Sequence, residues 1–101
     1  MDALEAILGR RSIRKYTAEP VSETDVETIL HAAMAAPSAG NQQPWRFVVT
    51  ADRAQLDAMA GTTPYGKMLR EAPLAITVCA DTGGLKHDMM WQQDCGAATE
   101  N

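Results

Sequence analysis

An amphipathic helix pattern between residues 26 and 34 sets the strongest limit on the fold. Its apolar side chains recur at the spacing of one helix face, at Val26, Ile29, Leu30, Ala33 and Met34. Ser22 is placed to cap this helix, and the acidic residues that follow it lie in the first turn, where the helix dipole favours negative charge. The pattern ends at Pro37 and Gly40, which predict a tight polar loop.

Shorter patterns around this helix predict two strands and three further helices. Two apolar runs, residues 45–50 and 74–79, have strand length and could be buried on both faces. Helices are expected at residues 2–9, at 52–59 with Asp52 as a cap, and from Asp88 to Asn101. The order helix, helix, strand, helix, strand, helix indicates an α/β or α+β layered arrangement, and 101 residues allow one domain.

Charge and apolar content exclude several classes of protein. The formal net charge of −4 argues against a nucleic-acid binder, because affinity for phosphate backbones comes from clustered Lys and Arg. Every apolar run is far shorter than the ~20 residues that cross a bilayer. Because residues 1–9 lack the order of a secretory signal, we expect a cytoplasmic protein with no membrane partner. Cys79 and Cys95 are expected to be buried or partly buried free thiols.

Basic residues alternate directly after the first helix. Arg10, Ser12 and Arg14 are two residues apart in a segment expected to be extended, so their side chains can point the same way. Guanidinium groups stay charged and form forked hydrogen bonds to oxygen atoms, which suits a phosphate or an anionic ring. A solvated basic surface explains the same residues, and composition alone favours it.

Small and polar residues make up the loop from Ala36 to Trp45. The small residues permit close approach of a ligand to the backbone, and Ser38 and Asn41 can hydrogen-bond a planar polar ligand. Taken alone, the loop is equally compatible with a structural turn whose Trp45 packs in the core.

Together, the two stretches resemble the nitroreductase family. Residues 10–16 after a helix, and residues 37–45 about one helix later, match both N-terminal signatures of that family in order and spacing. The resemblance continues through residues 71–73 and 94–101, so it covers essentially the whole chain. Family members run on past Asn101 with further strands, a glycine-rich stretch and a late basic residue. We therefore expect residues 1–101 to be the N-terminal part of a single, apparently truncated nitroreductase-like domain.

The resemblance implies a fold and an activity. The fold would be α+β, of the FMN-dependent nitroreductase type, which is a three-layer helix/sheet sandwich in full-length members. The activity would be an oxidoreductase reaction in which NADH or NADPH reduces nitroaromatics, quinones or related small acceptors through FMN. The family also implies a homodimer with FMN at the subunit interface.

The first signature would hold the cofactor's polar groups. Arg10, Ser12 and Arg14 would bind the phosphate, ribityl and pyrimidine oxygens of FMN, with Arg11 contributing from the same turn. A cation near the N1/O2 edge stabilises the negative charge of the reduced ring, and Arg14 is the candidate for that role. Lys67 is a weaker candidate for a position near the flavin.

The second signature would act from the neighbouring subunit. Pro37, Ser38 and Asn41 would approach the flavin bound by the partner chain. No side chain is expected to act as a catalytic acid or base, because hydride transfer to and from flavin N5 depends on stacking and positioning. His31 is expected at the surface or an interface, and His87 lacks partners at metal-ligand spacing, so no metal site is expected.

Two other interpretations remain open from the sequence. A short form could be a non-catalytic flavin-binding or interaction module. In such a form the apolar faces of both strands and of the final helix would lack partners, and the exposed patch would favour association or aggregation. A nucleic-acid binder using residues 10–15 is the third interpretation, and the net charge opposes it.

Overall fold

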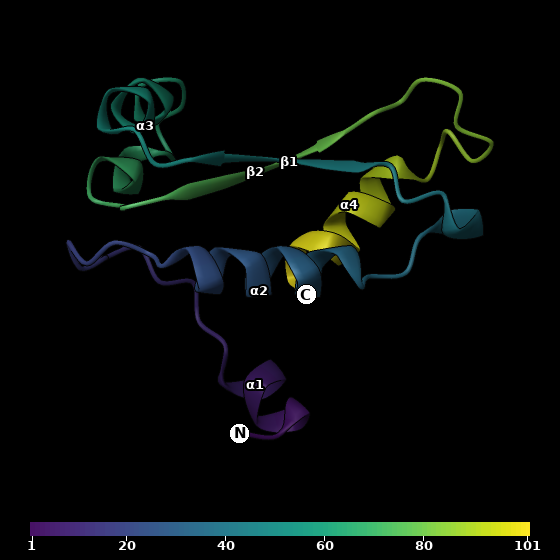
Figure 1. Cartoon of the computed structure of the whole chain (residues 1–101), viewed down its shortest axis with the longest axis horizontal. Coiled ribbons are helices and arrows are strands. Elements are labelled where there is room, and N and C mark those ends of the chain that lie inside the picture. The colour runs from purple at the N-terminus through teal and green to yellow at the C-terminus, as the bar shows by residue number, and fades with distance from the viewer.

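The computed structural model describes residues 1–101 and combines helices with one small sheet (Figure 1). The α-helices are α1 (Ala3–Gly9), α2 (Glu23–Met34), α3 (Arg53–Ala60) and α4 (Trp91–Glu100). The strands are β1 (Trp45–Thr50) and β2 (Ala75–Ala80), and two short 3-10 helices are η1 (Ala39–Asn41) and η2 (Lys67–Arg70). The predicted order of helices and strands is confirmed.

Local side-chain caps start α2 and α3 at the predicted residues. The side chains of Ser22 and Asp52 each accept a hydrogen bond from the third backbone N–H of their helix. Asp2 and Glu5 form a reciprocal capping box at the start of α1. Each cap of this kind stabilises a helix by about 1 kcal/mol, so these boundaries follow from nearby residues alone.

The start of α4 differs from the prediction. The helix begins at Trp91 instead of Asp88, and its first residue is preceded by Met90, which offers no side-chain cap. His87 explains the difference, because its backbone N–H donates to the Gln42 side chain and its carbonyl accepts from the N–H of Met90. This attachment to a distant loop holds the segment before α4 in a turn.

The two strands pair antiparallel, with Trp45 opposite Ala80 and Thr50 opposite Ala75. Alternation along the strands places Trp45, Phe47 and Val78 on one face, where they join the core. The opposite face carries Val48, which is 52% exposed, and Cys79, which is also exposed. The prediction of strands buried on both faces is therefore wrong for most of the sheet, because helices cover one face and on the other face only Thr50 is buried.

The two thiols differ in burial. Cys95 is half-buried, as expected, whereas Cys79 is exposed on the open face of β2. The expected burial of Cys79 is therefore wrong, since it depended on a second layer against that face.

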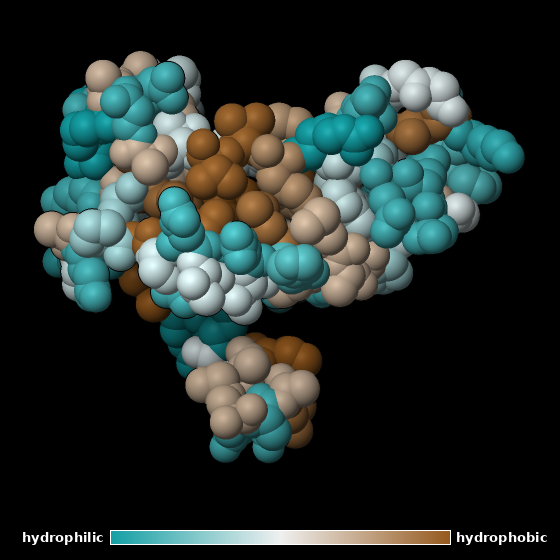
Figure 2. Space-filling model, viewed as in Figure 1, coloured by the Kyte–Doolittle hydropathy of each residue, from teal (hydrophilic) through white to brown (hydrophobic).

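The core lies where α2 and α4 meet one end of the sheet. Ala33, Ala36, Trp45 and Ala98 form a buried cluster, and α4 packs against α2 and against both strands. The apolar side of α4 is thus covered, contrary to the expectation that the final helix lacks a partner. A groove between α2 and the sheet stays open beside Val26 and Val49, and Figure 2 shows apolar surface there.

Helix α1 stands apart from the rest of the chain (Figure 1). Its apolar side chains Leu4, Ile7 and Leu8 are 63%, 69% and 68% exposed, and no residue of the helix is buried. Figure 2 shows this apolar surface on the projecting helix. An amphipathic helix with its apolar face in water is typical of a segment that contacts another surface.

Candidate functional site

The first signature forms an exposed, extended segment directly after α1. Residues 10–16 are all exposed, and none of their basic side chains forms an ion pair. Arg11 donates to the carbonyl oxygens of Leu8 and Arg10, at 3.1 and 2.8 Å, which folds its side chain back on the end of the helix. The guanidinium groups therefore have no carboxylate partner and can meet an anion.

Arg14 lies in a basic groove. The groove has a volume of about 720 Å³ and is lined by Arg14, Lys15, Lys67 and Arg70, together with Pro64, Tyr65, Met68 and Glu71. Four of the nine Lys and Arg residues of the chain line it, and none of the four is in an ion pair. Lys15 and Arg70 had no specific role in the sequence interpretation. Lys15 follows Arg14 in the same segment, and η2 contributes Lys67 and Arg70 to the groove.

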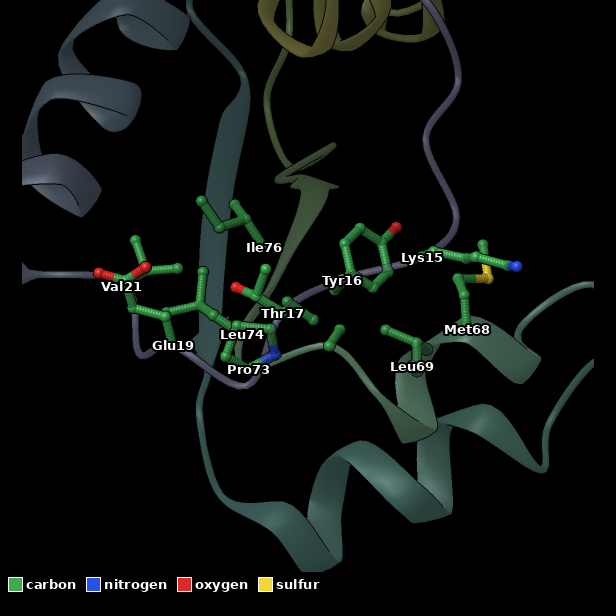
Figure 3. A pocket seen from close by; sticks show the side chains of 12 residues that line it. Lys15, Tyr16, Thr17, Glu19, Val21, Met68, Leu69, Pro73, Leu74 and Ile76 are labelled. Atoms are coloured by element: carbon green, nitrogen blue, oxygen red, sulfur yellow. The ribbon is translucent and has the colours of Figure 1, made fainter.

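A second, apolar groove lies along the chain segment that follows Arg14. Figure 3 shows Tyr16 between Ile76 of β2 and Leu69 of η2, with Thr17 and Val21 further along the same segment. The Tyr16 hydroxyl donates to the Ile13 carbonyl at 3.0 Å, which bends the segment locally. Residues 15–21 thus run along a groove whose other side is formed by η2 and β2.

The second signature forms a tight turn between α2 and β1. Gly40, Asn41 and Gln43 all have positive φ, at 55°, 54° and 47°. The Ser38 hydroxyl accepts a hydrogen bond from the backbone N–H of Gln43 at 3.0 Å, which leaves its proton free for another acceptor. The Asn41 side chain is exposed and forms no hydrogen bond within the chain, and Pro37 is exposed next to it.

A buried carboxylate anchors this turn. Asp94, which is 4% exposed, accepts hydrogen bonds from the Ala39 backbone N–H at 2.8 Å and from the Gln42 side chain at 2.9 Å. Sequence reasoning missed both Asp94 and Gln42. The available signal was that Asp94 shares a helix face with Ala98 and Trp91, where a carboxylate must find partners.

The two signatures do not meet within one chain. Segment η1 lies at the end of the sheet where β1 begins, and η2 lies at the end where β2 begins. Because the pair is antiparallel and six residues long, these ends are separated by about 17 Å, and Figure 1 shows η1 and η2 on opposite sides. The groove of Arg14 thus lies at the other end of the sheet from the turn with Pro37, Ser38 and Asn41, and Arg10, Arg11 and Ser12 precede Arg14 in the same exposed segment.

The half-buried thiol of Cys95 is less acidic than an ordinary thiol. Burial raises the pKa of the Cys95 thiol above its ordinary value of 9.0, and the charges of Asp94 and Cys79 raise it further. A raised pKa keeps the thiol protonated and therefore a poor nucleophile.

No group of three or more His, Cys, Asp or Glu residues has an arrangement that could hold a metal ion. None of the helices has both the length and the apolar content to cross a bilayer.

Comparison with known proteins gives a consistent set of relatives. The sequence model of the nitroreductase family matches residues 7–80. A protein of Archaeoglobus fulgidus, provisionally named an NADH dehydrogenase/NAD(P)H nitroreductase, is 52% identical over 101 residues, which are 99% of this chain and 58% of that protein.

Two crystal structures have the same arrangement. A provisionally named NADH oxidase of Clostridium acetobutylicum superposes with a TM-score of 0.90 and 48% identity, over 93% of this chain and 57% of that chain. A provisionally named nitroreductase of Desulfovibrio desulfuricans, in complex with FMN, gives a TM-score of 0.88 and 43% identity over 96% of this chain and 57% of that chain. The chain thus spans less than two thirds of the length of each of these relatives.

Proposed function

The chain belongs to the nitroreductase family and has the α+β fold of its solved members. We propose that it functions as an FMN-dependent oxidoreductase that takes electrons from NADH or NADPH. The observation that carries the proposal is the basic groove in which Arg14 and Lys67 lie together without an ion pair. The relative from Desulfovibrio desulfuricans was crystallised with FMN, which supports the choice of cofactor.

The donor set fits the polar edge of FMN. Arg10 and Ser12 hold the terminal phosphate in this proposal, with Arg11 at the same turn, because guanidinium and hydroxyl groups together donate to several phosphate oxygens. Arg14 and Lys67 hold the pyrimidine edge of the ring, where cations favour the extra negative charge of the reduced form. Bound FMN supplies the hydride chemistry, while the side chains bind and orient it.

A second subunit completes the site in this proposal. The turn with Pro37, Ser38 and Asn41 lies at the end of the sheet opposite to η2, which lines the groove of Arg14, so in this proposal the turn serves the flavin of a partner chain. The exposed apolar face of α1 supports a homodimer, because burying it removes apolar area from water. Asn41 then offers its free amide to the partner's flavin.

The substrate class is a small planar acceptor. Nitroaromatics, quinones and related molecules fit this proposal equally, because bound FMN would supply the hydride, while the side chains of the chain would bind and orient the ring. The proposal includes a cytoplasmic location with no nucleic-acid or membrane partner. Two free thiols are typical of such a reducing compartment.

A flavin-binding or interaction module without turnover is the second candidate. It is favoured by the few buried residues, 11 of 101, and by the many exposed apolar side chains. The two candidates differ in one observation, which is whether added NADH or NADPH reduces the bound flavin.

Absorbance spectroscopy of the purified protein tests the proposal. After reconstitution with FMN and removal of free cofactor, we expect the yellow spectrum of bound oxidised flavin, which bleaches when NADPH or NADH is added without oxygen. A colourless protein would contradict flavin binding. A yellow protein that neither donor bleaches would favour the module without turnover.

A further inference from the structure

Asp94 is a buried carboxylate that no cation balances. It is 4% exposed and forms no ion pair. Every other acidic residue of the chain is more exposed than Asp94. Its position in the first turn of α4 lets the helix dipole favour its charge. A charge kept away from water persists only when hydrogen bonds compensate it, so its partners indicate what it does.

Both partners of Asp94 belong to the turn of the second signature. One carboxylate oxygen accepts from the backbone N–H of Ala39 at 2.8 Å, and the other accepts from Nε2 of Gln42 at 2.9 Å. These bonds join residues 52 or more positions apart in the sequence. Asp94 therefore connects α4 to the turn at two residues, one before and one after Asn41 in the sequence.

The amide of Gln42 can point only one way in this network. Its Nε2 donates to Asp94 and also to the His87 carbonyl at 3.0 Å, and its Oε1 accepts from the His87 N–H at 3.2 Å. Reversing the amide would set its NH₂ group against the His87 N–H and its oxygen against the carboxylate. The carboxylate of Asp94 and the backbone of His87 thus together fix the orientation of Gln42.

The turn that these bonds hold is one that most sequences avoid. Gly40, Asn41 and Gln43 have positive φ, a conformation that costs energy for a residue with a side chain such as Gln43. A Cβ added at Gly40 would lie 2.6 Å from Nε2 of His87, so the turn also packs closely against the segment before α4. External bonds must hold a backbone of this kind in place.

We propose that Asp94 and Gln42 are positioning residues that hold the left-handed turn at residues 40–43 and thereby present Asn41 to the flavin. The proposal rests on the proposed function, because the flavin is what Asn41 would meet. Asp94 touches neither cofactor nor substrate in this account and acts through the turn. The carboxylate matters because it has two acceptor oxygens for two donors, whereas an amide at this position has one and would set its own NH₂ group against either the Ala39 N–H or the NH₂ group of Gln42.

The experiment compares Asp94→Asn with the wild-type protein reconstituted with FMN. We expect the FMN dissociation constant to rise about tenfold to a hundredfold, as for the loss of a hydrogen bond to a charged group. In the protein without FMN, we expect the Ala39 amide to be protected from hydrogen exchange in the wild type and to lose protection in the variant. Glu100→Gln removes a charge from an exposed position of the same helix and should change neither measurement.

A second variant separates positioning from simple destabilisation. In Asp94→Asn/Gln42→Glu the carboxylate moves to position 42, where it accepts from the new Asn amide and from the His87 N–H, while the Ala39 N–H keeps an acceptor. The His87 carbonyl loses its donor, so the recovery is expected to be partial. We expect this double variant to bind FMN more tightly than Asp94→Asn by at least about threefold. A role in stability alone predicts instead that FMN affinity follows the melting temperature across the three proteins, so the melting temperature is measured beside each titration.

The outcomes distinguish this inference from the proposed function. Wild-type protein that binds FMN, with Asp94→Asn binding within about twofold of it, would overturn the positioning role alone. Free exchange of the Ala39 amide in the wild type would do the same. Failure of the wild type to bind FMN, with the Ala39 amide still protected, would overturn the proposed function, and the positioning role for a flavin would fall with it.

Discussion

Arg14 and Lys67 line the same groove, and neither forms an ion pair with an acidic residue. One lies in the extended segment after α1 and the other starts η2, so the fold brings together two cations that are distant in sequence. The cost of placing like charges near each other is offset when an anion lies between them. This relationship is the basis of the first two predictions.

Arg14→Ala should slow flavin reduction more than it weakens FMN binding, whereas Arg10→Ala should mainly weaken binding. The reason is that negative charge near Arg14 grows only as the ring is reduced, while the phosphate near Arg10 is charged throughout. Each effect should be about tenfold to a hundredfold. Stopped-flow reduction by NADPH and FMN titration measure the two quantities separately.

Arg46→Ala serves as the control for these variants. Arg46 is exposed on the sheet, where it forms an ion pair with Asp81 at 3.5 Å and donates to the Trp45 carbonyl. It follows the second signature but lies outside the groove of Arg14 and is not among the proposed flavin contacts, so its loss should leave both quantities unchanged. Similar losses of binding alone in Arg14→Ala and Arg10→Ala would show that Arg14 is a second anchor and that its assigned role is wrong.

Lys67→Gln should also slow flavin reduction, and its effect should overlap with that of Arg14→Ala. Both cations act on the same developing charge, so the double variant should lose less than the product of the two single effects, with a coupling on the order of 0.5–3 kcal/mol. Reduction rates of the four proteins give the coupling directly. Fully independent effects would indicate that the two side chains meet different groups.

Dilution should release subunits and FMN together. Pro37, Ser38 and Asn41 are proposed to contact the flavin of the partner chain, so a separated subunit has only half of the donors. Flavin fluorescence and light scattering over a dilution series measure both processes, and Leu8→Glu in the exposed face of α1 should shift both midpoints to higher protein concentration. A monomer that keeps one FMN per chain would rule out the shared site.

Iodoacetamide should alkylate Cys79 before Cys95. Cys79 is exposed, whereas burial, Asp94 and Cys79 raise the pKa of the Cys95 thiol above 9.0. Because the thiolate is the reactive form, labelling of Cys95 should stay slow at neutral pH and should rise as the pH passes above 9.0. The protonated thiol is the form that the fold favours, so any stability it adds is present at low pH and is lost as the pH rises through that raised pKa.

Mass spectrometry of the labelled peptides checks this order. Asp94→Asn removes one of the charges that raise the pKa of Cys95, so labelling of Cys95 should become faster in that variant. Equal labelling rates for the two thiols near neutral pH would contradict the difference in their environments.

The sequence predicts those parts of the fold that depend on neighbouring residues. Ser22 and Asp52 cap their helices as predicted because a cap needs only the next three residues. Exposure of Cys79 and Val48 could not be predicted in this way, since it depends on whether another layer covers the sheet. An apolar run indicates a strand but does not indicate how many of its faces are covered.

The candidate site follows the same division. The motif residues Arg14 and Asn41 stand out in the sequence, but their supports do not. Asp94 and Gln42 are 52 positions apart, and no local pattern connects a carboxylate in a helix with an amide in a turn. The same long-range bond network moved the start of α4 to Trp91, which the local cap signal at Asp88 could not reveal.

The choice between FMN and FAD tests the central claim most directly. Arg10 and Ser12 are proposed to close around a terminal phosphate, and FAD carries an adenosine group where FMN has that phosphate. Equilibrium titration of the purified protein without cofactor should give an FMN dissociation constant at least about tenfold lower than that for FAD, and Arg10→Ala should reduce this preference. Equal affinity for the two flavins, or a preference for FAD, would contradict the claim that this chain recognises FMN by its phosphate.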